Sequence, residues 1–322
     1  FCDVPANAII SAEDISPFYA IPLNLHRQGL DETVLDVLRV EAPPADLRAW
    51  EEIVSKLESA RTTVRIAAVG KYTGHEDAYK SINEAFVHAG IANNCRVQID
   101  WIDSEQFENR VLPREALKEY DGIVIGPGFG SRGVEGKIKT VTYARDSQTP
   151  YFGICLGMQI ACIELARNRL GLEDANTTEV DPETKNPVIS LLSEQRGVTE
   201  KGGTMRLGAY RCDLKPDTRA YEAYGVPVIQ ERHRHRYEFN NAYRQKLEKV
   251  AGLVVSGTHQ LGEHELVEII ELKDHPWFCA SQFHPEFKST PLKPQPLFRE
   301  FVKAALAHQQ RQHEVTREAA VS

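Results

Sequence analysis

The chain has 322 residues and a formal net charge of −8 at pH 7, and its charged fraction of 26% and hydrophobic fraction of 42% are ordinary for a globular protein. The negative charge argues against a nucleic-acid partner, and no apolar run reaches the roughly 18 residues that a membrane helix requires. The six cysteines form no paired framework, which indicates a reducing, cytoplasmic setting.

Residues 1–60 differ in sequence pattern from the rest of the chain, because prolines divide them into short segments. Helical apolar spacing occurs at 30–40 and at 46–57, but these helices are too few to bury a core of their own. The chain starts with Phe1 and not with methionine, so we expect a fragment or a processed product of a longer protein.

From residue 61 to residue 310, short apolar stretches alternate with helical patterns. This alternation predicts an α/β fold, with a doubly wound, mostly parallel sheet flanked by helices. Later stretches come closer together, which predicts an antiparallel extension of the sheet. Residues 311–322 are polar, and we expect a frayed tail. The predicted strands are 63–69, 96–102, 122–125, 151–154, 188–191, 228–231, 253–256, 266–271 and 278–282.

A cysteine stands at the junction of a predicted strand and a predicted helix. The apolar run that begins at Tyr151 ends in Gly153-Ile-Cys155-Leu-Gly157, and a helical pattern follows at once. This is the cysteine form of a nucleophile elbow, in which a sharp turn lifts one side chain above the sheet. The glycines are required because a Cβ would collide in so tight a turn, and the helix start favours a thiolate. The alternative is a structural core cysteine, which is our interpretation of Cys162.

A glycine-rich loop, Gly126-Pro-Gly128-Phe-Gly130, also follows a predicted strand. It lacks the Gly-Lys-Ser/Thr of a phosphate-binding Walker motif. Beside an elbow it can supply an oxyanion hole, with one N–H from Gly128 and one from Leu156. A plain turn is the alternative.

The sequence Phe283-His284-Pro-Glu286 supplies a base and a carboxylate two positions apart. Residues i and i+2 of a strand share a face, so the carboxylate can bind one imidazole nitrogen and leave the other for a sulfur. Together with Cys155 they suggest an acyl-transfer triad. The alternative is a core histidine beside a turn.

The stretch 231–238, Glu-Arg-His-Arg-His-Arg-Tyr-Glu, is rich in cationic residues. His233 and His235 share a strand face, but the arginines between them would repel a metal cation. A strand that recognises an anion through arginine is therefore favoured over a metal site, and a solvated charged strand is the third possibility.

These motifs together resemble the C-terminal, glutamine-hydrolysing part of the CTP synthase family. The cysteine elbow and the Phe-His-Pro-Glu-Phe segment are similar to class I glutamine amidotransferases in general. More specific are the stretches 128–137 (GFGSRGVEGK), 175–179 (ANTTE), 202–208 (GGTMRLG) and 231–236 (ERHRHR). Residues 1–60 resemble the end of the synthetase domain and its linker, residues 61–310 the amidotransferase domain. The loop departs from the family's usual Pro-Gly-Gly-Phe-Gly, but Gly128 keeps its N–H.

The resemblance implies site residues and partners. It implies a catalytic triad of Cys155, His284 and Glu286 that hydrolyses glutamine and supplies ammonia for the ATP-dependent amination of UTP to CTP. No metal site and no cofactor are expected in this chain, while ATP, Mg²⁺ and the activator GTP act in a complete enzyme that is a homotetramer through its synthetase domain. The implied glutamine contacts are Gly128, Leu156, Gly157, Met158, Gln159, Glu179 and Arg236. The implied nucleotide contacts are Glu13, Asp14 and Ile15 for ATP, and Tyr72 and Lys80 for GTP.

Two other functions remain open at this point. One is a related hydrolase, such as a γ-glutamyl hydrolase or a cysteine peptidase, for which the arginine-rich strand is not an expected feature. The other is a regulatory or assembly module with a vestigial pocket, against which the intact Cys155, His284 and Glu286 argue.

Overall fold

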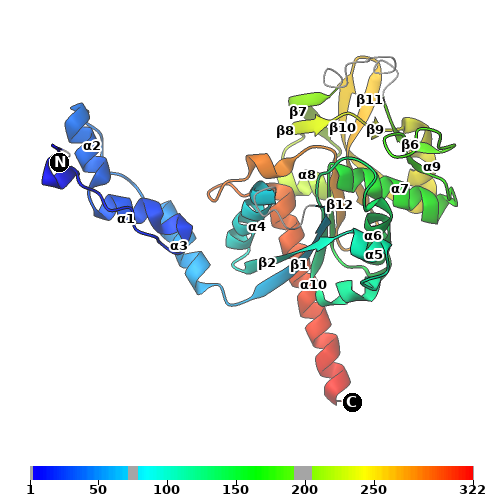
Figure 1. Ribbon diagram of the computed structural model, residues 1–322, viewed down its shortest axis with the longest axis horizontal. Helices are drawn as coiled ribbons and strands as arrows, with labels where there is room; N and C mark the ends of the chain where they lie inside the picture. The colour runs from blue at the N-terminus through cyan, green and yellow to red at the C-terminus, as the bar shows by residue number, and fades with distance from the viewer. Residues whose placement is uncertain (1–2, 72–78, 192–204, 322) are drawn as a thin grey trace.

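A nine-stranded sheet organises the computed structural model, which describes residues 3–71, 79–191 and 205–321 (Figure 1). The strand order is β2-β1-β3-β4-β12-β11-β10-β7-β8; the first five strands are mutually parallel and the last four pair antiparallel. The predicted α/β fold with an antiparallel extension is therefore confirmed. The strands are β1 (Thr63–Gly70), β2 (Arg96–Asp103), β3 (Gly122–Ile125), β4 (Tyr151–Ile154), β7 (Arg206–Leu214), β8 (Val228–His235), β10 (Leu253–Leu261), β11 (His264–Leu272) and β12 (Phe278–Ser281).

Helices cover both faces of the parallel half. Buried side chains of α6 (Val134–Ser147) and α7 (Leu156–Leu170) form the core on one face, and those of α4 (Lys80–Ala92) and α10 (Pro296–Val321) form it on the other. Every residue of β3 and β4 is consequently buried, which explains why both strands are continuous apolar runs.

The antiparallel half contains two differences from the sequence-based prediction. Strand β7, Arg206–Leu214, was not predicted. The stretch 188–191 does not extend the main sheet, because β6 (Pro187–Ser190) pairs instead with β5 (Asn176–Thr177) and β9 (Glu238–Phe239) in a separate three-stranded sheet. The short helices here are α8 (Arg219–Tyr224), η7 (Asn241–Tyr243) and α9 (Arg244–Ala251).

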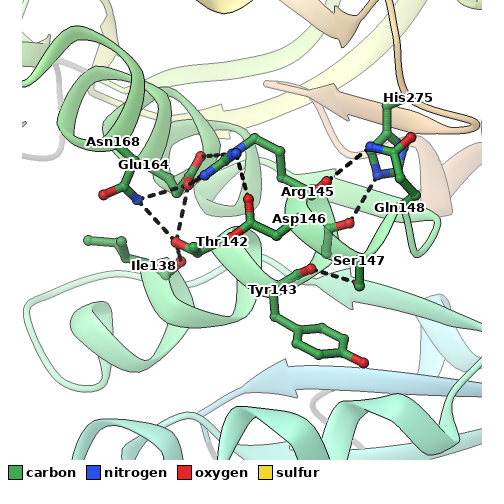
Figure 2. Close-up of polar contacts among 11 residues, drawn as sticks. Ile138, Thr142, Tyr143, Arg145, Asp146, Ser147, Gln148, Glu164, Asn168 and His275 are labelled. Atoms are coloured by element: carbon green, nitrogen blue, oxygen red, sulfur yellow. Dashed lines mark hydrogen bonds and ion pairs between the residues drawn. The ribbon is translucent and has the colours of Figure 1, made fainter.

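A buried ion pair between Arg145 and Glu164 joins α6 to α7 (Figure 2). Glu164 is fully buried, and its Oε1 accepts hydrogen bonds from Arg145 Nη2 (2.8 Å), Thr142 Oγ1 (3.1 Å) and Asn168 Nδ2 (2.9 Å). Because the carboxylate is fully bonded, its burial is compensated and the two helices are fixed to one another.

The described part of residues 1–60 forms an N-terminal arm, residues 3–60, that projects away from the sheet (Figure 1). One contact with α4 passes through Tyr19, whose hydroxyl bonds Glu84 Oε2 (2.5 Å) and His88 Nε2 (2.8 Å). His88 Nδ1 in turn bonds Ser289 Oγ at 2.9 Å. The arm contains η1 (Ala6–Ala8), η2 (Phe18–Ala20), α1 (Ile21–Arg27), α2 (Leu30–Leu38) and α3 (Arg48–Ser59).

The C-terminal segment is not frayed as expected, since α10 continues as a helix to Val321. Residues 311–317 are nevertheless exposed, in keeping with their polar sequence. None of the helices within the described ranges is both long and apolar enough to cross a membrane. The remaining elements are α5 (Glu105–Glu108), η4 (Arg114–Glu119) and η8 (Pro285–Lys288).

Candidate active site

Cys155 occupies the turn between β4 and α7. Its backbone has φ 54° and ψ −99°, in a region that residues with a Cβ rarely adopt, so the predicted elbow is present as a strained turn. A Cβ on Gly157 would lie 2.2 Å from the carbonyl oxygen of Ile125, and one on Gly153 would lie 2.8 Å from the backbone of Gly157. Both positions therefore require glycine, for the reason that the sequence suggested.

The Cys155 side chain lines a cavity of about 240 Å³ at the carboxyl ends of the parallel strands. The wall combines aromatic and apolar groups with one arginine and the predicted histidine and carboxylate. The rim is apolar, because Phe129 and Phe287 are 50% and 52% exposed. The lining residues are Tyr79, Ser81, Ile82, Pro127, Gly128, Phe129, Cys155, Arg234, His284, Glu286 and Phe287.

His284 and Glu286 meet as predicted, although not on a strand. Both follow β12: His284 precedes the short helix η8 and Glu286 lies within it, so a tight helical turn and not strand alternation brings the two side chains together. Nδ1 of His284 lies 2.8 Å from Oε1 of Glu286. Nε2 is buried and makes no hydrogen bond to any described residue, which leaves that nitrogen beside Cys155 for chemistry.

The electrostatics of His284 favour a charged ring. Burial by itself lowers the pKa of the imidazole, but the neighbouring Cys155 and the hydrogen-bonded Glu286 carboxylate outweigh it and raise the pKa to about 10. A buried imidazolium is stable here because a sulfur and a carboxylate lie on its two sides.

The glycine-rich loop approaches the elbow from the end of β3. A Cβ on Gly128 would lie 3.1 Å from the side chain of Leu156, so the loop backbone passes close to the start of α7. The Gly128 N–H donates to no described residue, whereas the Gly130 N–H donates to Glu179 Oε1 (2.8 Å). Buried Lys71, directly after β1, donates hydrogen bonds to the carbonyl oxygens of Phe129 and Gly130 and so holds the loop in place.

The first turn of α7 is buried, but its side chains do not line the cavity. The Gly157 carbonyl accepts a hydrogen bond from the Tyr151 hydroxyl (2.8 Å), and Met158 belongs to the core. Gln159 Nε2 donates to the Tyr237 carbonyl (3.2 Å) and to Gln282 Oε1 (3.3 Å).

Glu179 and Arg236 do not line the cavity, but the charges of both act on Tyr237. Burial raises the pKa of Tyr237, the charge of Glu179 raises it further, and Arg236 opposes the change. The arginine that does line the cavity is Arg234, on the exposed face of β8. Sequence reasoning named the arginine-rich strand but missed Arg234, and it missed Gln282, Phe129 and Phe287 entirely.

The implied nucleotide contacts lie elsewhere. Lys80 is exposed at the start of α4, between two residues of the cavity wall, Tyr79 and Ser81. Tyr72 lies outside the described residues. Glu13 and Asp14 are exposed and Ile15 is half-buried in the N-terminal arm, and the structure does not bring them to the cavity.

The described residues contain no group of three or more His, Cys, Asp or Glu side chains suited to a metal ion. His233 and His235 instead bond one another, Nδ1 to Nε2 at 2.9 Å, and burial lowers the pKa of both rings. They belong to a buried cluster in which Arg206 Nη1 pairs with Glu238 (3.0 Å) and Glu268 (2.9 Å). The alternation of β8 thus buries the histidines and exposes Arg232 and Arg234.

Comparison with known proteins identifies the family of the chain. The model of the family "Glutamine amidotransferase class-I" matches residues 75–304, and the chain belongs to that family. Within it, the chain is similar to CTP synthases: that of Rubrobacter xylanophilus is 54% identical over 320 residues, which are 99% of this chain and 57% of the relative, and that of Bacillus velezensis is 52% identical over 306 residues, 95% and 56%. The chain therefore spans little more than half the length of these relatives.

A solved structure gives the same result for the fold. The glutaminase domain of Trypanosoma brucei CTPS, with bound acivicin, has a TM-score of 0.71 and 40% sequence identity. The match covers 76% of this chain and 94% of that chain.

Proposed function

We propose that this chain hydrolyses glutamine to glutamate and ammonia at Cys155. The observation that carries the proposal is a strained elbow cysteine in a cavity whose wall also contains the hydrogen-bonded pair His284 and Glu286. Membership of the amidotransferase family supplies the substrate class.

In this mechanism the Cys155 thiolate attacks the carboxamide carbon of glutamine. The N–H groups of Gly128 and Leu156 stabilise the oxyanion that forms: Gly128 lines the cavity with Cys155 and lies against the Leu156 side chain, and Leu156 directly follows Cys155. The proline in the loop costs nothing here, because the Gly128 N–H is retained and is not used by another described residue.

His284 moves the proton. As an imidazolium beside the thiolate it protonates the leaving ammonia, and as a neutral base it then activates the water that hydrolyses the thioester. Glu286 holds the ring through Nδ1, so Nε2 is the nitrogen that faces the reaction.

Recognition of the amino acid part of glutamine is assigned to Glu179 and Arg236, with the backbone of 156–159. This assignment is supported by the charges of both residues acting on Tyr237, whose carbonyl also bonds Gln159 in the first turn of α7. Arg236 would bind the α-carboxylate in fork geometry, and Glu179 the α-ammonium.

The ammonia has its use in the complete protein. We propose that it aminates UTP to CTP, and the names of the similar CTP synthases support this product. The step is proposed to depend on ATP and Mg²⁺ and to take place in a synthetase domain that forms a cytoplasmic homotetramer. Glu13, Asp14 and Ile15 are proposed to lie by ATP, and Tyr72 and Lys80 to take part in activation by GTP.

One assay separates this function from its two alternatives. Ammonia release is measured from glutamine and from γ-glutamyl peptides, with and without GTP. Release from glutamine that Cys155→Ala abolishes supports the proposal. Preference for the peptides would indicate a related hydrolase such as a γ-glutamyl hydrolase. No release from either substrate, by the chain alone or joined to a synthetase domain, would indicate a regulatory or assembly module.

A further inference from the structure

The side chain of Gln282 contacts the sulfur of Cys155 but does not line the cavity. Gln282 is fully buried directly after β12, and its Nε2 lies 3.7 Å from Sγ of Cys155. Its own backbone N–H donates to the carbonyl of Glu268 (2.8 Å), so the residue is anchored to β11. Gln282 does not line the cavity, so its side chain reaches the sulfur from the protein interior.

The direction of this hydrogen bond is fixed by a neighbouring amide. The Tyr237 carbonyl can only accept, so the group of Gln159 that faces it at 3.2 Å must be the NH₂. The same NH₂ group lies 3.3 Å from the side-chain amide of Gln282, and its second hydrogen requires an acceptor there. Gln282 consequently presents its oxygen to Gln159 and its NH₂ to Cys155, since the reverse orientation would oppose two NH₂ groups.

We propose that Gln282 is a positioning residue of the nucleophile: its amide N–H donates to the Cys155 sulfur, holds the side chain in its attacking orientation and stabilises the thiolate over the thiol. This inference rests on the proposed function, because it takes Cys155 as the nucleophile. A sulfur anion is a better acceptor than a thiol, so a donor in this place favours the charged form.

Other groups act on the same sulfur. The ionisable side chains that line the cavity with Cys155 are Tyr79, Arg234, His284 and Glu286. Among them His284 supplies the positive charge next to the sulfur, and the N-terminal end of α7 adds its backbone dipoles. Gln282 differs from these groups because it carries no charge and does not titrate, so its loss removes one donor and leaves the other titrations in place.

The test is the pH dependence of Cys155 alkylation by iodoacetamide, followed by mass spectrometry of the Cys155 peptide. In Gln282→Met, which keeps the length of the side chain and removes the donor, the midpoint is expected to rise by about one pH unit. Gln282→Glu should raise it further, because a carboxylate would face the thiolate. In both variants kcat for glutamine should fall more than KM changes. Gln295→Met is the matched control: Gln295 is equally buried but bonds Glu231 and the start of α10, and its variant should keep the wild-type midpoint.

The outcomes separate the two ideas. An unchanged midpoint in Gln282→Met, in a chain that hydrolyses glutamine before substitution, overturns the role of Gln282 and leaves the proposed function intact. If Cys155 of the unaltered chain is not alkylated, or if the chain does not hydrolyse glutamine either alone or joined to a synthetase domain, the proposed function is overturned and this inference with it. If Gln282→Met does not fold, Gln282→Asn carries the same test, since its shorter amide draws the N–H away from the sulfur.

Discussion

Glu286 Oε1 accepts a 2.8 Å hydrogen bond from Nδ1 of His284, two residues earlier in the chain. Since the contact closes within a single tight turn, the orientation of the imidazole depends on very few backbone angles. The two residues therefore form one local unit directly after β12, beside the elbow cysteine that follows the neighbouring parallel strand β4.

Losses within the proposed triad should be unequal. Cys155→Ala should abolish glutaminase activity and His284→Ala should nearly do so, because each removes a group that changes bonding or protonation during the reaction. Glu286→Gln should cost less, since it only orients and stabilises the ring. Steady-state ammonia release measures this order. If Glu286→Gln, correctly folded, were as inactive as Cys155→Ala, this division of roles would be wrong.

A glutamine-like diazoketone is expected to label Cys155 and no other described cysteine. Burial raises the pKa of the Cys95 thiol to about 11 and raises that of Cys162, Cys212 and Cys279 further, so these four are poor nucleophiles near neutral pH. Cys155 alone among the described cysteines lines the cavity. Peptide mapping after labelling at pH 8 gives the answer, and a label on Cys95 or Cys279 would contradict the assignment.

Arg236→Ala should raise the KM for glutamine and change kcat less. Its proposed partner, the substrate α-carboxylate, carries the same charge in the ground and transition states, so the interaction is uniform binding. Arg232→Ala is the control, because Arg232 is an exposed arginine on β8, four residues before Arg236, and no contact with glutamine is proposed for it. A lowered kcat at constant KM would assign Arg236 to catalysis or to structure instead.

Glu164→Ala should lower the free energy of unfolding by about 3 kcal/mol, because it removes the buried partner of the largely buried Arg145 guanidinium and leaves only the exposed Asp146 (Figure 2). Glu135→Ala provides the comparison: its carboxylate pairs with Arg167 but is half exposed, and its loss should cost less than about 1 kcal/mol. Urea unfolding of both variants tests the difference, and equal losses would refute the role assigned to burial.

The buried cluster around Arg206 should make stability depend on pH. Burial raises the pKa of Glu268 to about 7 and of Glu238 to about 8, from ordinary values near 4.5. A carboxyl whose pKa is raised by folding stabilises the native state fully below its unfolded pKa, and this contribution is lost as the pH rises through the folded pKa. The stability of the unaltered chain relative to Glu268→Gln should therefore fall between about pH 4.5 and pH 8. Thermal unfolding across that range measures it, and a constant or rising difference would exclude a raised pKa.

Short sequence motifs were enough to predict the elbow and the His284–Glu286 contact of the candidate site. The glycines around Cys155 and the His-Pro-Glu segment are short motifs whose geometry is set by a few backbone angles, so the elbow and the His284–Glu286 contact followed from the sequence. The reasoning for the second was wrong in one respect, since a helical turn forms it in place of a strand.

Long-range pairing was not predictable in the same way. Nothing in 188–191 indicates that it pairs with β9 and not with the main sheet, because pairing depends on segments about fifty residues apart. Strand β7 contains a glycine and several charged residues, which obscure its alternation. The contact between Gln159 and Gln282 joins residues 123 positions apart, and only the folded sheet brings them together.

Hydrogen bonds from Tyr19 through His88 to Ser289 connect the N-terminal arm to the turn that contains Glu286. Tyr19 has one hydroxyl hydrogen, which the Glu84 carboxylate takes, so His88 must donate from Nε2 and accept the Ser289 hydroxyl at Nδ1. Ser289 is bonded through its own N–H to the carbonyl of Glu286. A chain of hydrogen bonds through the side chains of Tyr19, His88 and Ser289 thus connects the arm to Glu286, which bonds the imidazole. The donor and the acceptor of each bond in this chain are fixed. If the arm moved and Tyr19 left α4, His88 Nε2 would lose its acceptor, and the tautomer that accepts the Ser289 hydroxyl would no longer be favoured.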